Sequence, residues 1–341
     1  MPSIKNIPEV LTKTIKQREF AVLLVNIILI IIVGIRNPVF FTLENWKDLL
    51  MYGSILVFIS IGQMMTMVTG GIDLSVGSIL AFAGMSVGII MRENPSFHPL
   101  LLTFFGVLIG LGCGLFNGLL IGKGKIPPLI ATLATLSIFR GMVVLVSRSR
   151  WIVYGDITPG FKLIARGNTL GINNLMFAAL IIAVLSYYFL NHTMTGREIY
   201  AYGDNKLAAK FVGISRMRIE FIVYMISGVL AGLGGVLWVS RVNTAQASTA
   251  VGYEMQTVAA CVIGGVSIYG GVGSVIGVML GALLFSIILN ALELIGIVDF
   301  WKMSIQGLVI LLAVIFDAII AHRTKEQIRK QRRTFDAESN S

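Results

Sequence analysis

The sequence predicts an all-α polytopic membrane protein with about ten membrane-spanning helices. Of its 341 residues, 56% are hydrophobic and only 13% are charged, and the mean hydropathy is +0.85. A water-soluble domain cannot bury that much apolar surface. The apolar residues also form long runs separated by short polar stretches, which is the pattern of a chain that crosses a bilayer repeatedly.

Ten apolar runs are candidate spans, because a helix needs about 20 residues to cross a bilayer. In chain order they are 20–35, 51–69, 74–91, 100–121, 127–146, 173–190, 221–240, 257–268, 272–297 and 300–320. They define a membrane domain over 20–320, between a polar tail at 1–19 and a charged tail at 321–341. The first run lacks a small-residue cleavage site, so we expect a retained anchor and not a signal peptide.

The basic residues indicate the topology. With both termini in the cytoplasm, the cytoplasmic segments are 1–19, 122–126, 191–220 and 321–341, and they hold 17 of the 27 Lys and Arg residues. Segment 147–172 is the exception, because it carries four basic residues and must face outside if both flanking runs cross. Since the basic residues gather at the ends of apolar runs, the net charge of +10 indicates topology and not nucleic-acid binding.

Glycine spacing predicts tight helix packing. Two runs carry glycine at every fourth position: Gly106, Gly110, Gly114, Gly118 and Gly122 in the fourth run, and Gly273, Gly277 and Gly281 in the ninth. Such faces let helix backbones approach closely inside a membrane. We therefore expect a compact bundle.

Two glycine-rich breaks interrupt the apolar pattern. In the first, 70–78, Asp73 can cap a helix that begins at Leu74, and with Ser75 it would form a polar site of the kind that transporters use for hydroxylated or anionic solutes. The alternative is that Asp73 is only an N-cap at the cytoplasmic edge. The second break, 264–274, resembles the first weakly, and the two could correspond in an internal repeat.

Three further polar residues in apolar runs are candidates for a translocation path, together with Asp73 and Ser75: Asn117, Asn290 and Glu293. The two asparagines could instead join helices. Glu293 could instead extend to the outer interface and pair with Lys302.

No enzyme chemistry is indicated. The histidines His98, His192 and His322 fall in separate loops, and Cys113 and Cys261 lie inside apolar runs, so we expect no metal, no disulfide and no cofactor. Phosphate-loop, hydrolase and HExxH motifs are also missing from the sequence.

A polar stretch at 191–220 contains a short predicted helix, 205–212. Asp204 is the expected N-cap, Gly213 the expected left-handed end, and Ala208 and Ala209 the expected exposed positions. The stretch resembles the coupling-helix loop of bacterial ABC importer permeases, although Lys206 stands where that loop usually has an acidic residue. The resemblance implies contact with an ATPase through Gly203, Asn205, Ala208, Ala209, Gly213 and Ile214. The alternative is an ordinary basic cytoplasmic loop.

Three longer motifs extend the resemblance over nearly the whole chain. They are GGIDLSVGS at 70–78, IPPLIATLATLSIFRG at 126–141, and GGVSIYGGVGSVIGVMLGALL from Gly264, followed by Asn290, Leu292, Leu294 and Gly296. These motifs resemble the ABC permease family of the ribose, xylose and galactose type. Glu293 and Lys302 differ from the ribose-type pattern, which usually has Asn and often Gln there.

The resemblance implies a ten-helix permease of the vitamin B12 importer type in the bacterial cytoplasmic membrane. It implies two permease subunits, two cytoplasmic ATPase subunits and an external sugar-binding protein, with import of a ribose-like monosaccharide or a related furanose such as autoinducer-2. Because the chain has no phosphate loop, a separate subunit would hydrolyse the ATP. The alternative is an ion-coupled secondary carrier for a small polar solute, with Asp73 and Glu293 as its only plausible ion ligands.

Overall fold

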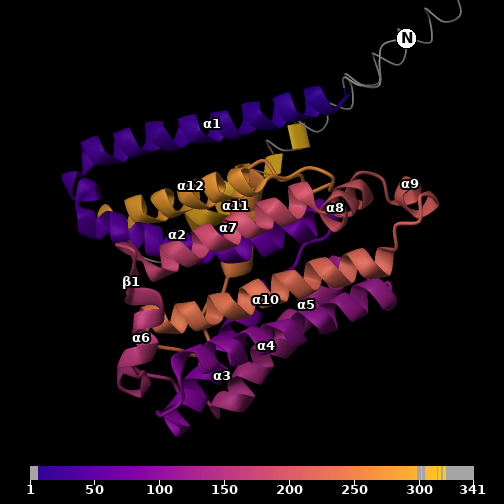
Figure 1. Ribbon diagram of the computed structural model, residues 1–341. Helices are drawn as coiled ribbons and strands as arrows, with labels where there is room; N and C mark the ends of the chain where they lie inside the picture. The colour runs from indigo at the N-terminus through magenta and orange to yellow at the C-terminus, as the bar shows by residue number, and fades with distance from the viewer. Residues whose placement is uncertain (1–6, 298–300, 302–303, 313, 316–317, 320–341) are drawn as a thin grey trace, which may run out of the picture.

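Two long helices, α2 (Leu43–Val68) and α10 (Arg216–Val242), lie inside a bundle of helices (Figure 1). The computed structural model describes residues 7–297, 301, 304–312, 314–315 and 318–319. Of the candidate spans, α2 is the most enclosed, with 89% of its apolar window buried. Nearly every residue from 51 to 68 is covered, because apolar or small side chains occupy all faces of this part of the helix.

The other helices pack around these two. On one side of α2, α1 (Ile7–Arg36) lies along α12 (Val275–Leu294), and α7 (Asn174–His192) and α11 (Tyr253–Ile263) lie between them and α10. On the other side, α3 (Val76–Glu93), α4 (Pro99–Gly118) and α5 (Pro128–Ser147) accompany α10 (Figure 1).

Among the described residues, eight helices are long and apolar enough to cross a membrane, and all eight overlap predicted spans. The predicted run 257–268 corresponds to α11, which has only 11 residues. The run 300–320 is described only in part, and its described stretch 304–312 is helical. Several helices begin earlier than predicted, because side-chain caps start them in polar sequence: Thr42 accepts from the Asn45 amide before α2, and Ser215 accepts from the Arg218 amide before α10.

The predicted glycine faces are confirmed. A side chain at Gly110 would overlap Gly228 and Gly232 of α10, so α4 and α10 touch backbone to backbone. Gly277 of α12 lies equally close to Gly264. A π-helical turn, Leu119–Lys123, continues α4 at its end.

The two ends of the bundle differ. One end carries α6 (Pro159–Arg166) and a short β-hairpin with strands of two residues each, β1 (Asn168–Thr169) and β2 (Ile172–Asn173). The other end carries α8 (Met194–Asp204) and α9 (Lys206–Phe211) (Figure 1). Two short 3-10 helices, Pro38–Phe41 and Tyr154–Asp156, complete the connections. The Ser240 hydroxyl joins α6 to the last turns of α10, since it accepts from the Ala165 amide at 3.0 Å and donates to the Phe161 carbonyl at 2.6 Å. Segments 147–172 and 191–220 therefore lie at opposite ends, as the predicted topology requires.

Candidate functional site

The short helix α9 has defined ends. The Asn205 side chain accepts from the amides of Leu207 at 3.1 Å and Ala208 at 3.0 Å, so Asn205 is the N-cap. The prediction that Asp204 caps this helix is wrong, because Asp204 still belongs to α8. Gly213 ends the helix with a φ of +85°, as predicted, and the Ile214 amide then donates to the Ala209 carbonyl at 2.9 Å.

The exposed face of α9 is not the predicted one. Ala208 is exposed as expected, but Ala209 is only 3% exposed because it faces the protein's own core. The exposed side chains are instead large and apolar: Leu207 at 73%, Phe211 at 89% and Val212 at 77%. These three residues form what we call the apolar α9 face.

Helix α8, which the sequence prediction treats as loop, seats α9 on the bundle. Gly203 lies against the Val68 carbonyl oxygen and the Gly271 amide, where any side chain would overlap the backbone. The Gly271 amide itself donates to the Val68 carbonyl at 2.8 Å. The two glycine-rich breaks therefore meet at one point, beneath the end of α8.

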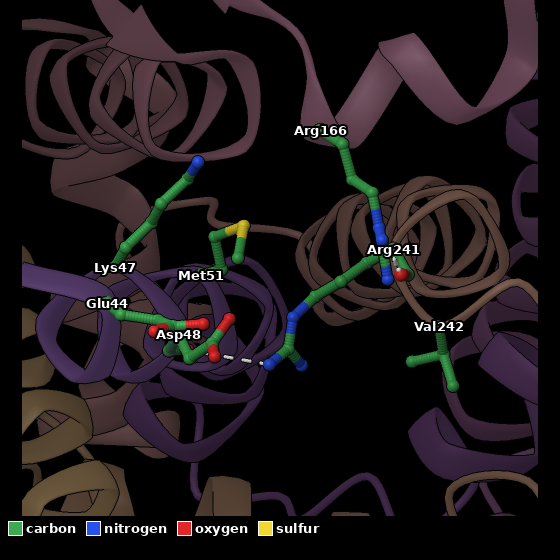
Figure 2. A pocket seen from close by; sticks show the side chains of 7 residues that line it. All are labelled: Glu44, Lys47, Asp48, Met51, Arg166, Arg241 and Val242. Carbon is green, nitrogen blue, oxygen red and sulfur yellow. Dashed lines mark hydrogen bonds between the residues drawn. The ribbon is translucent and has the colours of Figure 1, made fainter.

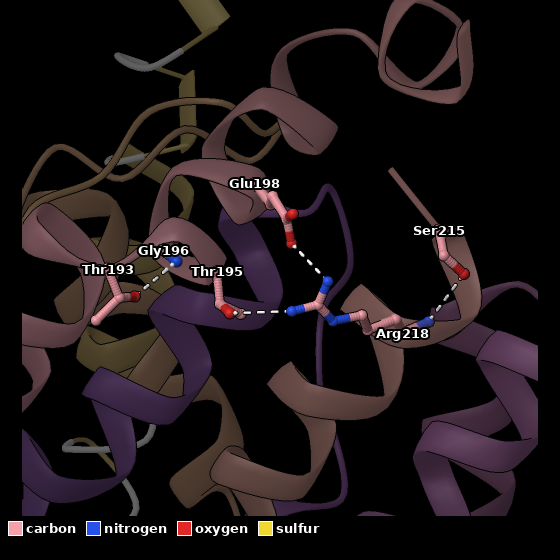
Figure 3. A network of polar contacts seen from close by, with 6 residues as sticks. All are labelled: Thr193, Thr195, Gly196, Glu198, Ser215 and Arg218. Atoms are coloured by element: carbon pink, nitrogen blue, oxygen red, sulfur yellow. Dashed lines mark hydrogen bonds and ion pairs between the residues drawn. The ribbon is translucent and has the colours of Figure 1, made fainter. Parts of the chain in front are cut away.

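Three polar contacts join α8 to the start of α10. The buried Tyr202 hydroxyl donates to the Glu220 carboxylate at 3.0 Å, and burial together with this carboxylate raises the pKa of Tyr202, so the phenol keeps its proton. Arg218 forms an ion pair with Glu198 at 3.3 Å and donates to the Thr195 hydroxyl at 3.4 Å (Figure 3).

Three predicted path residues come together at the first break. Asp73 is fully buried, and its carboxylate accepts from the Ser75 amide at 3.0 Å, the Ser75 hydroxyl at 2.6 Å and the Ser227 hydroxyl at 2.9 Å. Asn117 of α4 donates to the Ser75 hydroxyl at 2.8 Å. Helix α3 begins at Val76 and not at Leu74, because the Asp73 side chain holds the turn that precedes it. This cluster links the break to α4 and α10.

The other two candidates lie elsewhere, near the α6 end. Asn290 exchanges two side-chain hydrogen bonds with Asn45, at 2.8 and 3.1 Å, and so joins α12 to α2. Glu293 is exposed and borders a cavity. Its predicted partner Lys302 lies outside the described residues.

The cavity has two adjoining compartments, of about 540 and 420 Å³, which share Asp48 and Arg241. Figure 2 shows the residues that line the larger one. Arg241 donates to the backbone carbonyl of Asp48 at 3.4 Å, and its own carbonyl accepts from Arg166 at 2.8 Å. Sequence reasoning missed Asp48, Arg241 and Tyr52, because the wall brings together segments nearly 200 positions apart and no local motif marks them.

No group of three or more potential metal ligands occurs among the described residues, and both cysteines are buried and unpaired. The bundle is strongly apolar, but it contains buried polar side chains and a sizeable cavity. These features suit the binding of a solute and not its chemical conversion.

Apolar helices of spanning length, packed around two glycine-rich breaks, place the protein among the polytopic membrane permeases. The chain belongs to the family described as branched-chain amino acid transport system / permease component, whose model matches residues 45–314.

Similar curated proteins include the ribose import permease protein RbsC of Haemophilus influenzae, 38% identical over 89% of this chain and 93% of that protein. The autoinducer 2 import system permease protein LsrC of Yersinia enterocolitica is 33% identical over 92% and 86%. RbsC of Escherichia coli K12 is 33% identical over 85% and 91%. No solved structure matches the chain. The protein is thus a multi-pass permease of the bacterial cytoplasmic membrane.

Proposed function

We propose that this chain is the membrane-spanning subunit of an ATP-driven ABC importer that brings a ribose-like monosaccharide, or a related furanose such as autoinducer-2, into the cytoplasm. Its partners are a cytoplasmic ATPase subunit, a second permease and an external sugar-binding protein. Support comes from the ribose and autoinducer 2 import permeases that it resembles over most of its length. The chain itself makes no bonds and hydrolyses no ATP.

The observation that carries the proposal is the apolar α9 face. A helix of six residues, two of which are Lys206 and Lys210, is too short and too basic to enter the bilayer core. Leaving Leu207, Phe211 and Val212 in water is unfavourable, and contiguous exposed apolar groups with a polar rim are typical of protein contacts. Phe211 is the largest of the three and is the expected anchor in a pocket of the ATPase.

The contacts that join α8 and α9 to the bundle would transmit a movement of α9 to α10 and to the breaks. Gly203 seats α8 on the ends of both breaks, and Gly213 with Ile214 leads directly into α10. Tyr202 and Glu198 tie α8 to α10. An ATPase that pushed on α9 would therefore move α10 and both breaks together.

The alternative is a secondary carrier that couples transport to an ion. The buried carboxylate of Asp73 is the observation that favours it, because no basic side chain of the described residues is bonded to this carboxylate. Its oxygens are, however, already satisfied by two hydroxyls and an amide.

The experiment is uptake into proteoliposomes that contain the permease with an external sugar-binding protein and an ABC ATPase subunit from the same organism. Uptake should require ATP on the ATPase side, and Phe211→Glu should abolish ATPase co-purification while the permease stays folded. Leu170→Glu is the matched control, because Leu170 is 86% exposed on the hairpin at the other end. Uptake driven by a proton or sodium gradient without ATPase would support the carrier, and normal ATPase binding by Phe211→Glu would contradict docking at α9.

A further inference from the structure

The cavity at the α6 end of the bundle is lined by four helices and by Gln306 of the helical stretch 304–312. Its larger compartment lies between the start of α2, the end of α10 and α6 (Figure 2). Its smaller compartment continues between α2 and α12. Volumes of about 540 and 420 Å³ fall within the range of small-molecule sites. It lies at the opposite end from α9.

The charges on the cavity wall balance. Among the described residues, three acidic and three basic side chains line the two compartments: Glu44, Asp48, Glu293, Lys47, Arg166 and Arg241. Their formal charges sum to zero, so the wall has no net attraction for an anion or a cation. A charged ligand bound in either compartment would lie near at least one wall residue of the same charge. Such like-charge contacts disfavour unsuitable partners at interfaces.

The uncharged part of the wall offers both donors and acceptors. Ser286, Asn290 and Gln306 line the smaller compartment beside Tyr52, and hydroxyl and amide groups can each donate and accept. The Arg241 guanidinium has five N–H donors. Among the described residues, one of them donates to the Asp48 carbonyl, at a long 3.4 Å. Most of its hydrogen-bonding capacity is free for a ligand.

Aromatic rings support this wall. Tyr52 packs edge-on to Tyr253 at 6.3 Å between ring centroids, and Tyr253 packs edge-on to Trp238 at 5.4 Å. The Tyr52 hydroxyl is held by Gln256 at 2.6 Å, which fixes the ring, and Arg241 lies 5.8 Å over that ring. The buried Tyr253 hydroxyl has no hydrogen-bond partner within the described chain. A rigid ring beside a guanidinium and carboxylates presents an apolar surface and hydrogen-bonding groups together.

We propose that this cavity is a recognition site in the permease itself for an uncharged, polyhydroxylated ring, that is, a neutral monosaccharide. Asp48 accepts from sugar hydroxyls, Arg241 donates to them, and Tyr52 contacts the C–H face of the ring. The balanced charge makes the site reject phosphorylated or acidic sugars. This inference rests on the proposed function for the direction of transport but not for binding.

The test is protection of a cysteine from labelling, in the complete transporter reconstituted in proteoliposomes without nucleotide. Gln306→Cys places a thiol in the smaller compartment, and the native Cys113 and Cys261 are buried and should not react. D-ribose, D-xylose and D-galactose are tested alongside ribose 5-phosphate, with Leu170→Cys as the control outside the cavity. At twice its Kd, a neutral sugar should slow labelling about threefold, since only unoccupied sites react.

Two variants test the recognition chemistry. Asp48→Asn removes one negative charge, so protection by neutral sugars should weaken and ribose 5-phosphate should begin to protect. Arg241→Lys keeps the charge but loses the planar fork, so neutral-sugar protection should weaken without any gain for the phosphate. Glu93→Gln, an acidic residue at the end of α3 outside the cavity, should change nothing.

Failure of this inference is distinguishable from failure of the proposed function. Suppose that ATP-driven sugar uptake is normal but that no neutral sugar protects Gln306→Cys, or that ribose 5-phosphate protects it equally well while Asp48 and Arg241 are unchanged. In either case the cavity is a water-filled vestibule and the inference is wrong. If neutral sugars protect but ATP drives no uptake, the site stands and the importer proposal falls.

Discussion

Replacing Asp73 tests whether its buried cluster holds the bundle together. Asp73→Ala removes the acceptor of three hydrogen bonds, from the Ser75 amide, the Ser75 hydroxyl and the Ser227 hydroxyl. The orphaned amide cannot turn elsewhere and costs about 1–3 kcal/mol, and two hydroxyl bonds inside a membrane bundle are worth about 0.6 kcal/mol each, so the expected loss is about 2–4 kcal/mol. Thermal unfolding in detergent and the amount of folded protein in membranes measure it.

Asp73→Asn separates hydrogen bonding from charge. One amide oxygen still accepts from Ser75, and the Ser227 hydroxyl can rotate to accept from the new amide group, so the loss should stay below about 1 kcal/mol. ATP-driven uptake should persist in this variant. Wild-type stability of Asp73→Ala would refute the structural role, and normal stability with abolished transport in Asp73→Asn would favour the ion-coupled alternative.

Three further predictions concern the two ends of the bundle. Gly203→Val should separate α8 from the breaks and reduce folded protein strongly, since its side chain would overlap the Val68 carbonyl, whereas Gly141→Ala, with nothing within 4 Å, should be neutral in the same detergent melting assay. Tyr202→Phe should lower stability by about 1–3 kcal/mol at neutral pH, because the buried Glu220 loses its donor, and Tyr188→Phe, at an exposed position, should not. Thr158→Cys should react with impermeant reagents only from outside the cell, and labelling only from the cytoplasm would show that the predicted topology around α6 is wrong.

Much of the fold could be predicted because each membrane helix corresponds to one contiguous apolar run in the sequence. The fourfold spacing from Gly106 to Gly122 predicts a close-packed helix face, and this face contacts α10. The partner glycines Gly228 and Gly232 carry the same spacing and could have identified the second half of the contact. The span at 257–268 was misjudged because its apolar run includes part of the second break, where the helix has already ended at Ile263.

The presence of a short helix in the polar stretch 191–220 was predicted, but its cap and its buried face were not. Composition alone cannot say which face of a six-residue helix turns toward the rest of the protein, so Ala209 was expected outside although it is buried. Helix α8 did leave a signal, since the buried positions Gly196, Ile199 and Gly203 recur at helical spacing. The choice between Asp204 and Asn205 as the cap is a one-residue shift that propensity does not resolve.

The polar cluster at the first break is only partly local in the sequence. Asp73 and Ser75 adjoin in sequence, and Asn117 joins them from α4. Asp48 and Arg241 are separated by 193 positions, and only the packing of α2 against α10 brings them to one wall.

The length of α10 connects the two ends mechanically. Its 27 residues begin just after α9 and end with Arg241 and Val242 at the cavity. At 1.5 Å per residue the helix is about 40 Å long, so a lever rotation of about 5° pivoting at Arg216 would displace Arg241 by about 3 Å. That displacement equals a whole hydrogen-bond length. A small rotation of α10 at its α9 end would thus be enough to break the proposed contacts between Arg241 and a sugar. Movement of one straight helix would then couple the proposed ATPase contact at α9 to sugar release on the opposite side of the bilayer.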